Sequence, residues 1–284
     1  MRTVLEILKL STDYLQQKSI EHPRRQAEEL LGEALGLGRM GLYLEYNRPL
    51  TEDELKKCRD WLSRRSQGEP LQYIVGSLNF FDCRIKVMQD VLIPRQETEI
   101  LVDKIAKELS GQPLEEKVLW DVCCGSGCIG IALKKKFPAL RVILSDLSQK
   151  ALAIAKENAL ANEADVEFLC GDLLGPFKIN EKKADFIVCN PPYISEKDYE
   201  ALEVEVKGYE PRMALVAGYS GLEFYVRLAA DFPEFLHPRG KVWLEIGEGQ
   251  GEAIKQLFNI PCWTRCLCEK DWSGRERFFS LEIE

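Results

Sequence analysis

The stretch VLWDVCCGSG, Val118–Gly127, decides the fold class of this chain of 284 residues. Its first half is a short apolar run of the kind that forms a buried strand. Its second half contains two glycines, which allow a tight turn into the helix that the next residues predict. A strand that turns through glycine into a helix begins a βαβ unit, so we expect a parallel sheet covered by helices.

The residues after Gly127 continue this alternation of strands and helices. We expect helices near residues 128–137, 148–161, 221–235 and 252–258, and strands near 141–146, 166–170, 186–189 and 241–246. Two further strand-like runs, 263–267 and 277–283, have no clear helix between them, so they can form a hairpin with one strand antiparallel. The pattern predicts an α/β fold with a doubly wound, Rossmann-like and mostly parallel sheet.

The N-terminal part of the chain differs in character. Residues 1–68 carry apolar side chains at helical spacing, and Thr51 with Glu54 forms a capping box, so we expect a small helical bundle. Residues 69–94 contain a predicted β-hairpin that links this bundle to the remainder, 95–284. We therefore expect a helical domain, a hairpin linker and a catalytic domain.

Composition limits the classes of function. The formal net charge is −8, which argues against a protein that grips duplex nucleic acid mainly through phosphates. Neither a membrane-spanning run nor a signal peptide is evident, so we expect a cytoplasmic protein whose ten cysteines are mostly reduced and buried. Cys262, Cys266 and Cys268 match no common zinc spacing, so we expect no metal site.

Polar residues follow four successive predicted strands. They are Asp121 with the loop residues Cys123, Cys124, Gly125, Ser126 and Gly127; Asp146; Asp172 with Leu173; and Asn190. The carboxyl ends of parallel strands meet at one edge of the sheet, where such folds bind ligands. Asp146 can accept hydrogen bonds from a ribose, although it could instead cap the next helix in competition with Ser148. Asp172 can reach an adenine amino group, or be a plain turn residue, and Leu173 can cover the ring.

Two nucleotides fit this series. The residues from Gly125 match Gly-x-Gly-x-x-Gly, which is typical of dinucleotide sites, so NAD must be considered. The acid at Asp121 suits a ligand with a positive ammonium group better than one with a pyrophosphate. S-adenosylmethionine has that ammonium, a ribose and an adenine, so the series favours it.

The stretch Asn190–Tyr193 reads Asn-Pro-Pro-Tyr and follows a buried strand. Proline cannot donate to a sheet ladder and fixes its own φ, so pairing should stop at Asn190 and leave a rigid stub. The Asn190 side-chain oxygen and the Pro191 carbonyl can accept both hydrogens of a planar NH₂ group, while Tyr193 lies beside it. This clamp would orient a poor nitrogen nucleophile for methyl transfer and stabilise its developing positive charge.

With these motifs, nearly the whole chain resembles the HemK-type glutamine N5-methyltransferases, which modify the Gly-Gly-Gln glutamine of peptide chain release factors. The resemblance includes residues 70–76, 91–99, 121–127, 190–194, 210–215, 245–247 and 271–277. It implies a class I S-adenosylmethionine-dependent methyltransferase sheet of seven strands, one antiparallel, and an N-terminal domain that helps to recognise the release factor. We expect a monomer with no direct nucleic-acid binding and S-adenosylhomocysteine as its product.

The resemblance also assigns the site. The cofactor would contact Asp121, the loop 123–127, Asp146, Leu173 and Asn190, and the substrate glutamine would be held by Asn190, Pro191, Pro192 and Tyr193. The family usually has glycine and a small residue where this chain has Cys123 and Cys124, so cofactor affinity can differ here. Three alternatives remain: an N6-adenine methyltransferase that acts on DNA or RNA with the same clamp, an NAD-dependent oxidoreductase, and a non-catalytic interaction protein.

Overall fold

The computed structural model describes residues 2–178 and 183–284. The chain forms two compact units. One comprises the chain up to Ser77 together with Val204–Tyr209, and the other comprises Leu78–Glu203 and Glu210–Glu284. The hairpin predicted as a linker lies mainly in the larger unit, and a short segment far along the chain joins the helical one.

The smaller unit is a helical bundle. Its elements are α1 (Val4–Gln17), α2 (Pro23–Leu35), α3 (Gly38–Leu44), α4 (Glu52–Ser66) and α5 (Leu71–Val75). The predicted capping box is present, because the Thr51 side chain accepts from the Glu54 amide and the Glu54 carboxylate accepts from the Thr51 amide. The short helix α11 (Val204–Tyr209) packs here through Glu205, which pairs with the buried Arg65 at 2.6 Å.

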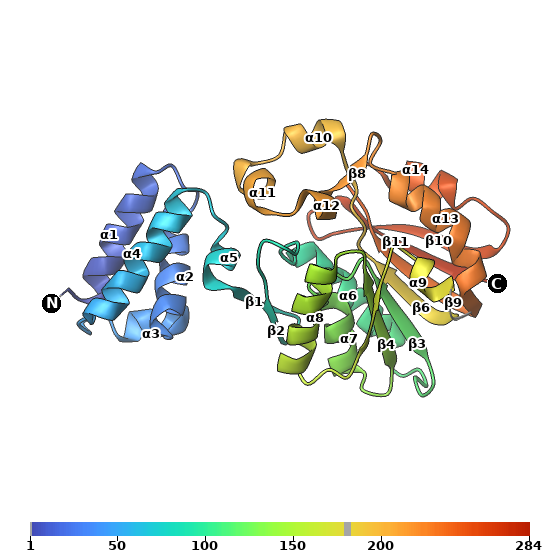
Figure 1. Ribbon diagram of the computed structural model, residues 1–284, viewed down its shortest axis with the longest axis horizontal. Helices are drawn as coiled ribbons and strands as arrows, with labels where there is room; N and C mark the ends of the chain where they lie inside the picture. The colour runs from blue at the N-terminus through green and yellow to red at the C-terminus, as the bar shows by residue number, and fades with distance from the viewer. Residues whose placement is uncertain (1, 179–182) are drawn as a thin grey trace. The chain divides into compact units, whose positions relative to one another are not determined.

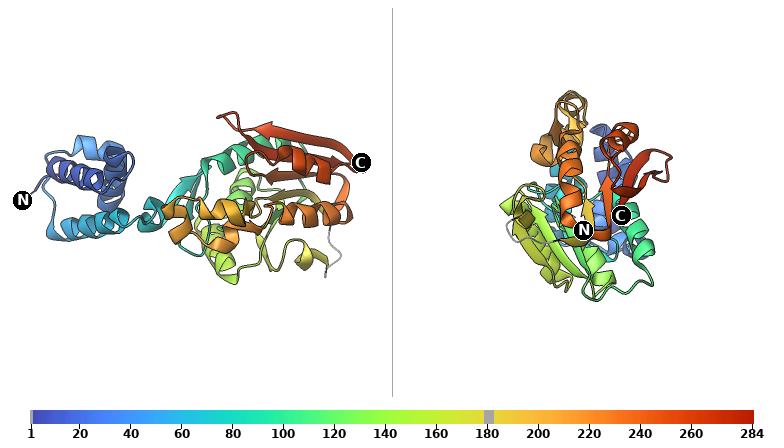
Figure 2. Two further views of the ribbon diagram at one scale, coloured as in Figure 1. Left: turned by 90° about the horizontal axis from the view of Figure 1, so that it is seen from above. Right: turned by 90° about the vertical axis from the view of Figure 1, so that its right-hand side faces the viewer.

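The larger unit is built on a seven-stranded sheet. Its strands are β3 (Val118–Val122), β4 (Arg141–Asp146), β5 (Glu167–Cys170), β6 (Ala184–Cys189), β9 (Leu236–Glu245), β10 (Trp263–Lys270) and β11 (Glu276–Ile283). The order is β10-β11-β9-β6-β3-β4-β5, and only β11 runs against its neighbours in this sheet. The predicted sheet, including its antiparallel C-terminal hairpin, is confirmed (Figure 2).

Helices cover both faces of this sheet (Figure 1). Helices α6 (Gln96–Leu109), α7 (Cys128–Lys136) and α8 (Gln149–Ala161) lie on one face, and α9 (Gly175–Lys178), α13 (Glu223–Phe235) and α14 (Gly251–Leu257) on the other. On the second face, Trp120 stacks on Phe177 with ring centroids 3.7 Å apart. Such burial of large aromatic side chains is the main stabilising contribution of this face. No helix in residues 2–178 or 183–284 is long and apolar enough to cross a membrane.

The hairpin β1 (Ser77–Phe80) and β2 (Cys83–Lys86) turns at Phe81 and Asp82, both with positive φ. Helix α8 holds β2 in place, since the Asn158 side chain accepts from the Lys86 amide at 2.7 Å. The hairpin is therefore anchored on the helices that cover the sheet.

The segment after the stub holds elements that the sequence pattern did not reveal. Strands β7 (Ile194–Ser195) and β8 (Val216–Gly218) pair in parallel, and α10 (Glu196–Glu200) and α12 (Arg212–Leu215) lie between them in sequence. These elements have two to five residues, too few for either periodicity to be visible. The expected strand 241–246 begins earlier, at Leu236, and ends at Glu245.

Candidate active site

A pocket of about 940 Å³, including its open mouth, lies at the carboxyl ends of the parallel strands. This is the edge of the sheet at which open α/β folds bind ligands. Nine of the thirteen residues predicted for the site line it: Cys123, Cys124, Gly125, Ser126, Asp146, Asp172, Leu173, Asn190 and Pro192. The other four predicted residues do not line the pocket; they are Asp121, Gly127, Pro191 and Tyr193.

The loop after β3 turns sharply. Cys123, Gly125 and Gly127 have φ values of 59°, 53° and 79°. A side chain on Gly125 would meet open space, whereas one on Gly127 would come within 2.9 Å of Leu144. Gly125 therefore leaves room in the pocket, and Gly127 allows close packing of α7 on the sheet.

Asp121 lies beneath this loop and is completely buried. One carboxylate oxygen accepts from the Gly130 amide at 2.8 Å, and the other has no hydrogen-bond partner. Burial, with a further contribution from Asp146, raises its pKa to about 7. The carboxyl group is thus part of the loop's support, behind the pocket wall.

Asp146 is at the pocket surface. Its two carboxylate oxygens accept from the amides of Gly125 and Ser148, both at 2.8 Å, and burial raises its pKa. Ser148 is the N-cap of α8, since its hydroxyl accepts from the Ala151 amide at 3.2 Å. Asp146 therefore joins two pocket loops, and the capping role belongs to Ser148.

The third strand end supplies Asp172 and Leu173. Asp172 pairs with Arg227 of α13, and Leu173 is buried with φ 48°. This conformation is unfavourable for a leucine, so packing of the apolar side chain against the core must hold it. Leu173 forms part of the apolar floor of the pocket.

The stub Asn190–Tyr193 begins where β6 ends, as the two prolines predict. Asn190 and Pro192 face the pocket. Tyr193 is partly buried behind them, with its carbonyl oxygen accepting from Gln250 at 2.9 Å. The stub is thus held from the core side while its first residue borders the cavity.

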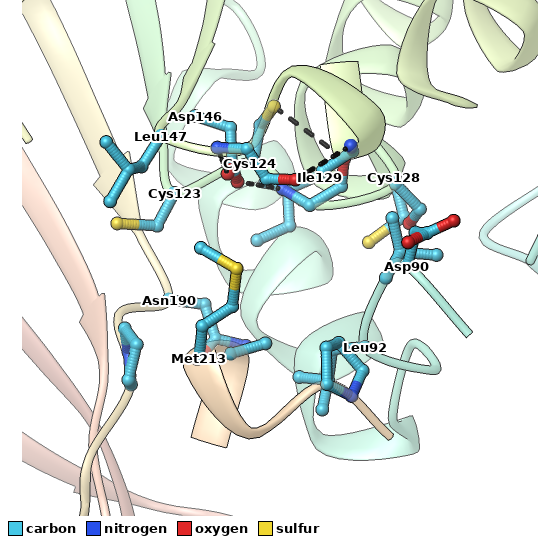
Figure 3. A pocket seen from close by; sticks show the side chains of 18 of the residues that line it. Asp90, Leu92, Cys123, Cys124, Cys128, Ile129, Asp146, Leu147, Asn190 and Met213 are labelled. Atoms are coloured by element: carbon cyan, nitrogen blue, oxygen red, sulfur yellow. Dashed lines mark hydrogen bonds between the residues drawn. The ribbon is translucent and has the colours of Figure 1, made fainter. Parts of the chain in front are cut away.

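Two stretches complete the pocket without having been assigned a role from the sequence. The lining residues in the first stretch are Asp90, Val91, Leu92, Pro94 and Thr98, and those in the second are Pro211, Met213 and Ala214. Buried Glu210 joins them, because it accepts from the Ile93 amide at 3.1 Å and pairs with Arg95. Figure 3 shows the Met213 side chain extending into the pocket toward the loop that carries Cys123. The only sequence signal for these walls was their match to motifs of the family.

In the described part of the chain, no cluster of three or more His, Cys, Asp or Glu side chains could hold a metal ion. Cys124, Cys128 and Cys189 are buried, and Cys123 is partly buried. Desolvation raises the pKa of Cys124, Cys128 and Cys189, so these thiols are protonated at neutral pH. They act as small apolar side chains around the loop.

Comparison with known proteins agrees with this architecture. Residues 6–76 match a PrmC N-terminal domain and residues 96–206 a methyltransferase small domain. In structure, the chain is similar to a methyltransferase from Pyrococcus furiosus, with a TM-score of 0.50, 18% identity and coverage of 71% of this chain and 89% of that one. A 16S rRNA N2 G1207 methyltransferase from T. thermophilus, solved with AdoMet and guanosine, has a TM-score of 0.51 and 14% identity. The match covers 73% of this chain and 50% of that one. At this identity the likeness shows the fold alone.

Full-length relatives carry the family assignment. The release factor glutamine methyltransferase of Chlamydia trachomatis serovar D is 42% identical, covering 98% of this chain and 93% of its own. The enzyme of the same name from Geobacter sulfurreducens is 39% identical, covering 97% of this chain and 95% of its own. The one from Bacillus cereus is 37% identical, covering 99% of both chains. The polar strand ends, the rigid stub and this similarity along the whole sequence lead to one conclusion: the chain belongs to the release factor glutamine methyltransferase family.

Proposed function

We propose that the pocket binds S-adenosylmethionine and that the enzyme methylates the side-chain nitrogen, N5, of the glutamine in the Gly-Gly-Gln motif of peptide chain release factors. The observation that carries this proposal is that Asn190 and Pro192 border the same cavity as the three other polar strand ends. A clamp for an NH₂ group and the elements of a nucleoside site therefore share one space.

The residues present fit the cofactor. Asp146 lies where a ribose can be bound, Leu173 gives an apolar surface for adenine, and the space at Gly125 admits the amino acid part. Asp121 is behind the loop, so its expected contribution to ammonium binding acts through the loop and the start of α7, where it accepts from the Gly130 amide. S-adenosylmethionine supplies an electrophilic methyl group and leaves as S-adenosylhomocysteine.

The stub supplies orientation. The Asn190 side-chain oxygen and the Pro191 carbonyl accept the two N–H groups of the glutamine amide, so that the nitrogen lone pair faces the methyl carbon. The new N–C bond forms as the S–C bond breaks, and one proton leaves the nitrogen for solvent. Because the prolines fix these acceptors in advance, they stabilise the positive charge on nitrogen without reorganisation.

Methylation of adenine in DNA or RNA is the less favoured function. The same tetrapeptide could hold an adenine amino group, but the chain is acidic, and the RNA methyltransferase reported above shares only the fold. The relatives at 37–42% identity act, by name, on release factor glutamine.

The experiment is a transfer assay with methyl-labelled S-adenosylmethionine and three acceptors: an unmodified release factor, the same factor with the Gly-Gly-Gln glutamine changed to glutamate, and mixed DNA and RNA. We expect label in the first acceptor alone. Label in nucleic acid, or equal label in the glutamate variant, would contradict the proposed substrate.

A further inference from the structure

The carboxylate of Glu245 lies next to the stub and has no assigned role. Cys189 of β6 is paired with Leu244 of β9, and the two strands are parallel. The next residues, Asn190 and Glu245, therefore emerge side by side at the carboxyl ends of their strands. Glu245 is 1% exposed and is not among the residues that line the pocket.

Two hydroxyl groups lie next to this carboxylate. The Thr98 hydroxyl donates to one oxygen at 2.7 Å, and the Tyr193 hydroxyl lies 3.5 Å from the other. The register of β6 and β9 places the Asn190 side chain at the neighbouring strand end, where it favours the charged carboxylate and so acts to lower the pKa of Glu245. An ionised carboxylate can only accept, so the end of the Asn190 amide that is compatible with a position next to Glu245 is the Nδ2 donor.

The orientation of an asparagine amide is otherwise weakly determined, because its oxygen and nitrogen ends are nearly the same in shape. The clamp requires the oxygen to face the acceptor. An acceptor-only neighbour on the core side selects that orientation, since the reverse would bring two oxygens together.

We propose that Glu245 is a positioning residue that fixes the Asn190 amide with its nitrogen toward the core and its oxygen toward the substrate amide. This inference rests on the proposed function of the stub. The backbone of Glu245 is also secured, because the Tyr225 hydroxyl donates to the Glu245 carbonyl at 2.8 Å.

The test exchanges the two side-chain types. Glu245→Gln can both donate and accept, so it no longer selects one Asn190 orientation. We expect kcat to fall about 10- to 100-fold, while the Kd for S-adenosylmethionine changes less than about 2-fold.

The second variant is Asn190→Asp, which alone places two carboxyl groups together and should lower kcat more. In the double variant, the new amide at position 245 donates to the new carboxylate at position 190, which keeps an oxygen toward the substrate. The kcat of the double variant should therefore exceed that of Asn190→Asp by about 10-fold or more.

Glu108→Gln is the matched control. Glu108 is a partly buried carboxylate that pairs with Lys241, four residues before Glu245 in the middle of β9, and it has no contact with the stub. We expect this control to have a lower thermal midpoint but an unchanged kcat.

Wild-type turnover on the release factor tests the proposed function itself. With wild-type turnover present, a Glu245→Gln enzyme at the wild-type kcat, or a double variant no faster than Asn190→Asp, would overturn the positioning role.

A pH profile makes the test independent of how well these variants fold. Burial raises the pKa of Glu245, against the opposing effects of the Thr98 hydrogen bond, Arg277 and Asn190, while Glu97 acts in the same direction as burial. A protonated Glu245 can donate to the Asn190 oxygen, so kcat should have an acid limb above pH 4.5. Thr98→Val removes a bond that favours the charged form, so the limb should move to higher pH. Asp121 and Asp146 have no hydrogen bond to Thr98, and a limb that stays in place would contradict the inference.

Discussion

At the scale of single residues, Asp121 has the least favourable environment among the predicted site residues. It is completely buried, only one of its oxygens is hydrogen-bonded, and its pKa is raised to about 7 from 3.8. The folded protein therefore retains a proton over a range in which the unfolded chain has already lost it. The stability contributed by this group is present below pH 4 and is lost as the pH rises toward 7.

We expect Asp121→Asn to flatten this dependence. The isosteric amide does not ionise, so between pH 5 and 8 the variant should lose less stability than the wild type, by an amount on the order of 1.4 kcal/mol per unit of pKa shift. The measurement is the thermal unfolding midpoint over that range without cofactor. Parallel curves for the two proteins would show that the Asp121 carboxyl group is not the source.

Residue types at strand ends could be predicted from the sequence, but their exact positions could not. Asp121 and Asp146 both follow apolar strands, yet Asp146 lines the pocket and Asp121 supports the loop from behind. The difference depends on the three-dimensional course of the glycine turn, with three positive φ angles in five residues. No local sequence pattern specifies which side of such a turn a carboxylate will face.

At the scale of elements, two features shape the pocket. One is the glycine turn after β3, and the other is the pair of contacts that Glu210 makes with Ile93 and Arg95, which we call the Glu210 bridge. In the turn, Gly127 and Gly125 have similar φ angles but different surroundings. Gly127→Ala should destabilise the protein by about 2–4 kcal/mol, because its new methyl meets Ile131 and Leu144 at 2.9 Å. Gly125→Ala meets no neighbour and should cost about 1 kcal/mol of backbone strain. Denaturant unfolding of both variants measures this difference, and equal losses would contradict it.

The Glu210 bridge joins residues 90–95 to the segment that starts at Pro211. Glu210→Gln removes a buried charge from Arg95, so we expect a loss of about 2–3 kcal/mol and a roughly 10-fold higher Kd for S-adenosylmethionine. Glu196→Gln is the control, because Glu196 and its partner Arg212 are both about half exposed. Calorimetric titration should show no change for the control. Equal effects of the two substitutions would exclude a special role for the bridge.

The long elements of the sheet were predictable because each has a clear periodicity, and their alternation limits the topology. The pocket walls at 90–94 and 211–214 were not, because they have no periodicity and are joined by a contact between residues 115 positions apart in sequence. Glu245 was likewise recognisable only as a motif. Its role depends on the register of β6 and β9, which the sequence pattern does not specify.

At the scale of the whole molecule, the chain consists of two compact units, and the helical one matches a PrmC N-terminal domain. We propose that this unit contributes to recognition of the release factor. A chain without residues 1–68 should lose most of its kcat/KM on the intact factor, while its Kd for S-adenosylmethionine and its rate on a short Gly-Gly-Gln peptide change little. Unchanged kcat/KM on the intact factor would show that the helical unit is not needed for recognition.

The measurement that tests the central claim most directly is mass spectrometry of a release factor after incubation with S-adenosylmethionine and either the wild-type enzyme or Asn190→Ala. The wild type should add the mass of one methylene to the Gly-Gly-Gln glutamine. Asn190→Ala should bind S-adenosylmethionine nearly as well but leave the glutamine unmodified, because the clamp has lost an acceptor while the nucleoside site is intact. Methylation of the glutamine by Asn190→Ala at the wild-type rate would contradict the clamp, and wild-type enzyme that leaves this glutamine unmodified would contradict the proposed reaction.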